Sequence, residues 1–195
     1  MRNAALMDRW NPLIKTASRR FGVPEIWIRA VMMIESGGRT MLGEHAPITS
    51  SAGAMGLMQV MPKTWSEMRR QYGLGNDPYN PHDNIFAGTA YLELLYRQYG
   101  YPGLFAAYND GPDMLEAHRR LRQFLPAETT AYVLGVASIL STGVRQARIP
   151  TDDAAGIAQP STPIFIDTGA VVSVPTIRPR QTADGDGAAG SDDER

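Results

Sequence analysis

The stretch Ile26–Ile34 is hydrophobic nearly all round and runs directly into a single carboxylate, Glu35. A helix without a polar face normally lies in the middle of a domain. Pro24 suits the first turn of such a helix and Gly37–Gly38 suit its end, so the sequence predicts a central helix over about residues 24–36. Glu35 then lies in the last turn, where an ionised side chain is costly to bury.

Apolar side chains recur with a helical period as far as about residue 143, and no alternation of strands competes with it. We therefore expect a mainly α fold. Residues 39–61 are rich in Gly, Ser and Ala and lack a helical period, so we expect a long ordered loop with a small hairpin within residues 43–54. Asp83 or Asn84 is a candidate helix cap. The other expected helices cover about residues 6–21, 62–72, 83–100, 103–108, 113–124 and 126–142.

Composition divides the chain near residue 150. Residues 1–150 carry nearly all the aromatic and long aliphatic side chains, whereas residues 151–195 are dominated by Asp, Gly, Ala, Thr and Pro. The first part has 16 Lys and Arg against 12 Asp and Glu, and the second has 3 against 8. We expect one domain over residues 1–150 and a disordered, flexible acidic tail over residues 151–195. The basic excess is too small to indicate nucleic acid binding.

Several classes of site and segment find no support in the sequence. The chain has no cysteine, and its three histidines, His45, His82 and His118, lack metal-ligand spacing, so we expect no metal and no cofactor. The glycine-rich loop is not followed by the Gly-Lys-Ser/Thr of a phosphate loop. Neither a signal peptide nor a membrane span of about 20 residues is visible. The Asp-Thr-Gly at residues 167–169 is interpreted as a turn in the tail.

Glu35 has the setting of a catalytic acid. Cleavage of a glycosidic bond needs a carboxylic acid that is still protonated near neutral pH. Apolar neighbours and the partial negative charge of a helix C-terminus both disfavour the ionised form, so we expect a raised pKa for Glu35. Taken alone, a Glu beside two glycines is more often a solvated residue at a helix end, so other motifs must decide.

Those motifs are similar to the lytic transglycosylases of the soluble-type, goose-lysozyme-like group. The resemblance spans residues 22 to about 140, and its blocks occur in the family's order. The long glycine-rich block SSAGAMGLMQVMP is the most specific of them. The blocks are Glu35–Ser36, residues 50–62, residues 84–92, residues 107–112 and residues 128–133.

The resemblance implies a lysozyme-like helical domain whose cleft between helices binds peptidoglycan glycan strands. Glu35 would be the only essential carboxylate, first as acid on the bond between N-acetylmuramic acid and N-acetylglucosamine, then as base toward the C6 hydroxyl. The product would carry a 1,6-anhydro ring. Since the sugar supplies the nucleophile, no second carboxylate is required, and Asp110 is interpreted as a solvated or capping residue.

Four further polar side chains match motif positions that contact the glycan. Gln59 and Asn109 resemble residues that hydrogen-bond the sugar or orient the acid, and a Gln or Asn within an apolar block needs such partners. Tyr108 and Tyr132 resemble residues that pack on the glycan and position its polar groups.

Ser50 and Met61 resemble contacts in the wall of the cleft. The segment between Glu35 and Gln59 is longer than in many family members and includes Arg39. This extra length leaves the shape of the subsites and the preferred glycan length open.

Two other functions stay open on the sequence alone. One is a goose-type lysozyme that hydrolyses the same bond, and the other is an inactive peptidoglycan-binding module. The substrate places the protein in the periplasm or cell envelope, and the small single domain suggests a monomer that serves a secretion, conjugation or phage machine.

Overall fold

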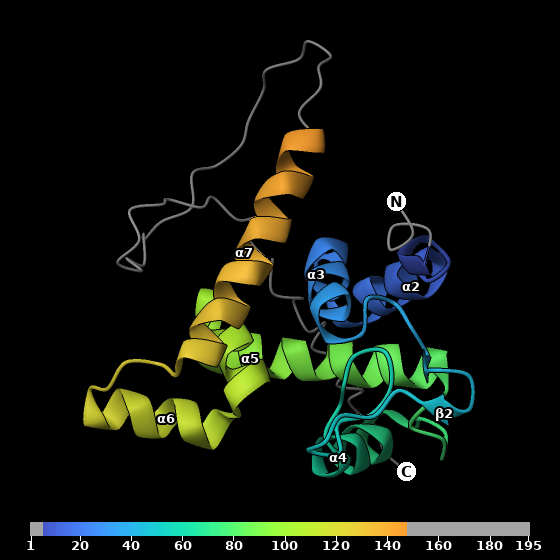
Figure 1. Ribbon diagram of the computed structural model, residues 1–195, viewed down its shortest axis with the longest axis horizontal. Helices are drawn as coiled ribbons and strands as arrows, with labels where there is room; N and C mark the ends of the chain where they lie inside the picture. The colour runs from blue at the N-terminus through green and yellow to red at the C-terminus, as the bar shows by residue number, and fades with distance from the viewer. Residues whose placement is uncertain (1–5, 148–195) are drawn as a thin grey trace, which may run out of the picture.

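The computed structural model describes residues 6–147, with side chains as far as residue 142, and this part of the chain is mainly helical (Figure 1). The predicted fold class is thereby confirmed. The predicted domain boundary at residue 150 and the acidic tail lie outside the described residues. The helices are α2 (Asn11–Phe21), α3 (Glu25–Glu35), α4 (Pro62–Tyr72), α5 (Pro81–Asp110), α6 (Pro112–Leu121) and α7 (Ala127–Ala147), and the strands are β1 (Met41–Leu42) and β2 (Ala46–Pro47).

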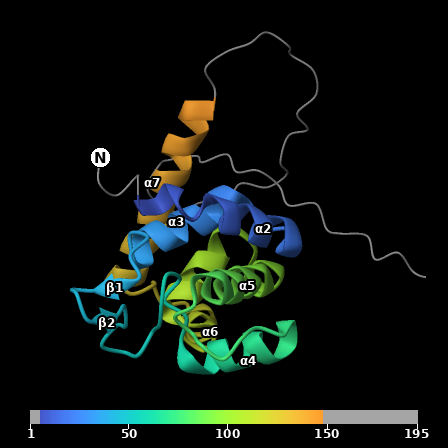
Figure 2. The same cartoon turned by 90° about the vertical axis from the view of Figure 1, so that its right-hand side faces the viewer.

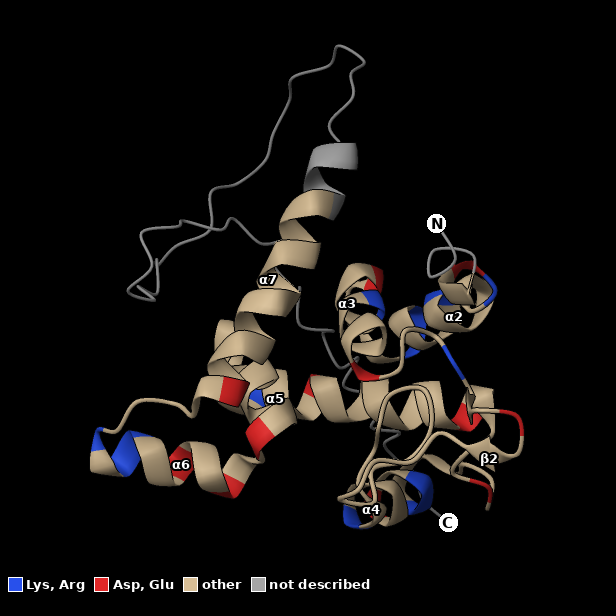
Figure 3. Cartoon of the chain, viewed as in Figure 1, with Lys and Arg blue, Asp and Glu red and all other residues tan. Residues whose placement is uncertain are grey.

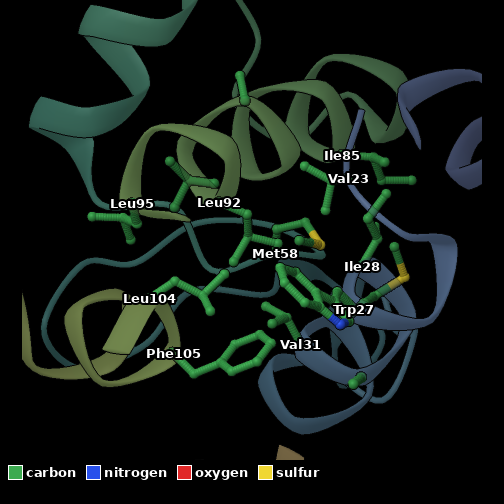
Figure 4. Packing of buried hydrophobic residues seen from close by; sticks show 14 of the residues in the cluster. Val23, Trp27, Ile28, Val31, Met58, Ile85, Leu92, Leu95, Leu104 and Phe105 are labelled. Carbon is green, nitrogen blue, oxygen red and sulfur yellow. The ribbon is translucent and has the colours of Figure 1, made fainter. Parts of the chain in front are cut away.

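Helix α5 is the scaffold on which the other elements pack. It contacts α2, α4, α6 and α7, while α3 packs against α2 and α7. Figure 2 shows α5 between the α2–α3 pair on one side and α4 on the other. The apolar stretch of α3 supplies the centre of the core, where Trp27, Ile28 and Val31 meet Leu92 and Phe105 of α5 (Figure 4).

The loop between α3 and α4 is ordered, as predicted, and its hairpin is formed by β1 and β2 at residues 41–47. Two further bridges, Thr49 with Met55 and Met55 with Val60, fold the rest of the loop back on itself. Met58 at its centre is fully buried among the core residues (Figure 4). The glycine-rich block is therefore a packed part of the domain.

The predicted cap of α5 was wrong. Asn80, and neither Asp83 nor Asn84, caps this helix, because its side chain accepts hydrogen bonds from the backbone N–H groups of His82 and Asp83. Asn80 was missed although Pro81, which follows it, is typical of the first position of a helix. Asn84 is instead buried inside the domain.

Helix ends differ from the expectation at three places. The first predicted helix breaks at Arg9–Trp10, and α2 then begins with a proline in its first turn. Helix α5 loses helical geometry at Gly100, as predicted, and α6 ends at Leu121 because Arg122 adopts a left-handed conformation. Helix α7 continues through Gly143 to Ala147, since a single glycine weakens a helix without necessarily ending it.

Arginines occupy the last turns of α2, α4 and α6, as the blue segments of Figure 3 show. A cation there interacts favourably with the partial negative charge of the helix C-terminus. Part of the basic charge of the domain thus stabilises the ends of its helices.

The close packing of α5 against the loop generates a stability prediction. A Cβ at Gly88 of α5 would lie 2.6 Å from Cβ of Met58, whereas one at Gly135 of α7 would meet only the flexible end of Ile34, at 3.3 Å. Gly88→Ala should therefore destabilise the protein by ~1–3 kcal/mol through overpacking. Gly135→Ala should be neutral or stabilising, because Ala is the better helix former. Urea unfolding measures both, and equal losses would contradict the packing described.

Candidate active site

Glu35 ends α3 and faces the first turns of α7. Its Oε1 accepts a hydrogen bond of 2.6 Å from the hydroxyl of Tyr132, a residue 97 positions later in the chain. Tyr132 is itself buried, and α3 and α7 pack against each other. Glu35 and Tyr132, which lie far apart in the sequence, are thus hydrogen-bonded to each other.

Burial sets the protonation of Glu35. The pKa of its carboxyl group is raised from 4.5 to about 7, because desolvation raises it by more than the hydrogen bond from Tyr132 lowers it. The expected raised pKa therefore agrees with the structure, with loss of water as its main cause. At neutral pH the acid and the carboxylate are both well populated, which suits a group that first gives and then takes a proton.

The glycine-rich loop is joined to the end of α3 beside Glu35. Ser36 is buried, and its hydroxyl donates a hydrogen bond of 2.8 Å to the carbonyl of Leu57. The hydroxyl oxygen of Ser36 also accepts a hydrogen bond of 3.1 Å from the backbone N–H of Gly38, which stabilises the turn after the helix. The sequence identified Ser36 only as part of a motif, because the spacing of residues in the sequence does not indicate a hydrogen bond to Leu57.

Tyr108 supports the loop from the end of α5. Its hydroxyl donates to the carbonyl of Met58 at 2.7 Å, and its ring packs against Tyr91 with centroids 5.6 Å apart. Burial raises the pKa of Tyr108 well above its ordinary value, and the charge of Glu35 raises it further, so the two groups lie close enough to interact. The hydroxyl of Tyr108 is thus engaged within the protein, and packing of Tyr108 on the glycan stays a prediction.

Gln59 is also engaged with the loop. Its backbone has a positive φ of 46°, and its side-chain nitrogen donates to the carbonyl of Gly56 at 2.8 Å and toward that of Ile48 at 3.4 Å. These bonds leave its side-chain oxygen as the atom available to a ligand. A role in glycan binding stays a prediction.

The other predicted contacts are on the surface or partly exposed. Met61 precedes α4 and is 45 % exposed, while Asn109 near the end of α5 is partly buried. The hydroxyl of Ser50 accepts from the backbone N–H of Ala54 at 3.0 Å and so stabilises a turn of the loop. Their contacts with a glycan, and the cleft itself, stay predictions.

Asp110 differs from the expectation. It is neither solvated nor a helix cap, because its carboxylate is mostly buried and lies 3.4 Å from Nε2 of His118 on α6. The sequence did not predict that these two residues lie together, because a contact between two helices cannot be read from the spacing of neighbouring residues. Oδ2 of Asp110 and Nε2 of His118 thus lie close together although no hydrogen bond joins them.

Two other kinds of feature, a metal site and a membrane-spanning helix, are absent among residues 6–147. No group of three or more His, Cys, Asp and Glu side chains among residues 6–147 is arranged to hold a metal ion. Within the same range, no helix combines the length and apolarity needed to cross a membrane.

Two solved structures share this fold. The lytic transglycosylase Slt of Pseudomonas aeruginosa, determined as an inactive mutant with glutamine in place of a glutamate, superposes with a TM-score of 0.58 and 26% identity over 70% of this chain and 24% of that one. The 70 kDa soluble lytic transglycosylase SLT70 of Escherichia coli gives 0.56 and 28% over 67% of this chain and 23% of that one. The helical fold and these structural matches define a lysozyme-like helical domain, in which the partly buried Glu35 is hydrogen-bonded to Tyr132.

Sequence comparison gives the family. The family model described as the transglycosylase SLT domain matches residues 12–130, more than half of the chain, so the chain belongs to this family. This confirms the resemblance stated above.

Named relatives agree with that assignment. An endo-type membrane-bound lytic murein transglycosylase A of Citrobacter koseri is 31% identical over 140 residues, which cover 69% of this chain and 59% of the relative. A membrane-bound lytic murein transglycosylase C of Glaesserella parasuis is 36% identical over 97 residues, 47% of this chain and 25% of the relative. The chain thus spans between a quarter and three fifths of these two relatives.

The raised pKa of Glu35 predicts how its replacement alters stability with pH. The folded state binds the proton of Glu35 more tightly than the unfolded state, so this residue costs stability as pH rises from 4.5 through about 7. Relative to wild type, Glu35→Gln should gain on the order of 2 kcal/mol between pH 4 and pH 8.

Urea unfolding of both proteins at each pH measures this difference, and every other titrating group is common to the two. A stability difference that does not change with pH would show that Glu35 titrates as an exposed carboxylate.

Proposed function

We propose that this protein is a peptidoglycan lytic transglycosylase that cleaves the β-1,4 bond between N-acetylmuramic acid and N-acetylglucosamine without adding water. The observation that carries the proposal is the partly buried Glu35 with a pKa of about 7, hydrogen-bonded to Tyr132 in a domain of the SLT family. The names of the relatives, all lytic murein transglycosylases, support the same substrate.

The first step is proton donation by Glu35. Because Oε1 accepts the hydrogen bond of Tyr132, Oε2 is the oxygen left to carry the proton toward substrate. That proton goes to the glycosidic oxygen, and the bond from this oxygen to the anomeric carbon breaks with both electrons on the oxygen. The acetamido oxygen of the muramic acid stabilises the positive anomeric carbon. Glu35 is left ionised and still bonded to Tyr132.

The second step returns the proton. Ionised Glu35 takes the proton of the C6 hydroxyl of the same sugar, and the C6 oxygen bonds to the anomeric carbon to close the 1,6-anhydro ring. Glu35 is then protonated again, so a single carboxyl group serves both steps. Separate acid and nucleophile carboxylates, as used by most retaining glycosidases, are not needed.

The surrounding residues have supporting parts in this proposal. Gln59 and Asn109 would hydrogen-bond the sugar, Tyr108 would lie under the glycan, and Ser50 and Met61 would line its path. The protein would act as a monomer in the periplasm or cell envelope and serve a secretion, conjugation or phage machine.

Mass spectrometry of the fragments released from purified sacculi tests the chemistry. The wild type should release muropeptides with anhydro ends, each lighter by one water than the hydrolytic product, and Glu35→Gln should lower the rate at least ~100-fold. Products with reducing ends would indicate a goose-type hydrolase. Lysis by Glu35→Gln at the wild-type rate would show that Glu35 is not the catalyst, and no lysis by either would favour a wall-binding module.

A further inference from the structure

Asn84, in the first turn of α5, is a fully buried polar residue with every strong hydrogen-bonding group of its amide in use. Its Oδ1 accepts from the backbone N–H of Met58 at 2.8 Å. Its Nδ2 donates to the carbonyls of Met55 at 2.9 Å and Pro78 at 2.8 Å. One side chain therefore joins the glycine-rich loop and the α4–α5 connection to helix α5.

The glycine-rich loop packs tightly against the side chain of Asn84. A Cβ at Gly56 would lie 2.5 Å from Nδ2 of Asn84, and Gly56 has a φ of +73° that favours glycine. The loop backbone approaches the amide this closely because residue 56 has no side chain. A displacement of the loop would break bonds that a buried amide cannot replace with water.

The backbone of Met58 links Asn84 to the candidate active site. Its N–H is held by Asn84, and the carbonyl of the same residue is held by the hydroxyl of Tyr108 at 2.7 Å. The next residue, Gln59, has a left-handed backbone that non-glycine residues rarely adopt. On the other side of Met58, the carbonyl of Leu57 accepts from Ser36, the neighbour of Glu35.

We propose that Asn84 is a positioning residue for the reaction of Glu35: by fixing the backbone of Met58 it holds Tyr108 and Gln59 in place and keeps water from the acid. The inference rests on the proposed function, since it assigns a part in that reaction. Asn84 itself touches none of the reacting atoms and acts through the loop.

A buried Asn whose role is only to stabilise the domain would give a different result. Loss of such a residue lowers the free energy of unfolding and leaves the folded site unchanged. Loss of a positioning residue changes the surroundings of Glu35 in the molecules that remain folded. The titration of Glu35 reports those surroundings, because desolvation is the main cause of its raised pKa.

The test compares Asn84→Ala with Thr89→Val in the full chain. Thr89 lies on the same helix and is also fully buried, but its hydroxyl bonds only to the carbonyl of Ile85 on the preceding turn. The two variants thus each lose buried hydrogen bonding on α5, and only the first loses hydrogen bonds to the loop. Carbon-13 NMR follows the carboxyl of Glu35 with pH, and hydrogen exchange follows the Met58 amide.

Asn84→Ala should lower the midpoint of the Glu35 titration by about one pH unit or more toward 4.5 and speed exchange of the Met58 amide at least about tenfold. Thr89→Val should leave both near wild type. An unchanged titration in Asn84→Ala, or an equal shift in Thr89→Val, would overturn the proposal.

If Asn84→Ala does not fold, Asn84→Ser takes its place, because a serine hydroxyl cannot bond to all three partners of the amide. The same two measurements, the Glu35 titration and the exchange of the Met58 amide, then test the proposal. Both measurements are made without substrate, so they stand even if the protein proves not to cleave peptidoglycan.

Discussion

The partial burial of a single carboxyl group, that of Glu35, is the constraint on which the rest of this structure depends. An ionised Glu35 at the end of an apolar helix would be costly, and the protein keeps the group neutral over much of the pH range instead. The hydroxyl of Tyr132 gives the carboxyl a fixed partner. The same contact joins the first half of the fold, through α3, to its last described helix, α7.

The glycine-rich loop is the second requirement, because it must lie close to Glu35 without a side chain in the way. Ser36 attaches it to the end of α3, Tyr108 attaches it to the end of α5, and Asn84 attaches it to the start of α5. Each bond ends on a backbone group of residues 57–58. The loop can thus be rigid although it has little regular secondary structure.

The sequence predicted the features that are local and periodic. The apolar run of α3 and its closing glycines located Glu35 in a last helical turn, and the same reasoning placed α4 and the break at Gly100. It failed where several residues of the same kind compete, as with Asn80 and Asn84, and where partners lie far apart in the chain. The pairing of Asp110 with His118 and the engagement of the Tyr108 hydroxyl depend on packing between elements, which no short window contains.

The central claim is that loss of water raises the pKa of Glu35 to about 7, so that a large share of the group is still protonated at neutral pH, and a carbon-13 NMR titration of its carboxyl in the folded wild-type protein tests this most directly. The structure predicts a midpoint of about 7, compared with 4.5 for an exposed glutamate. A midpoint near 4.5 would show a solvated carboxylate and would contradict the account of Glu35 as an acid at neutral pH.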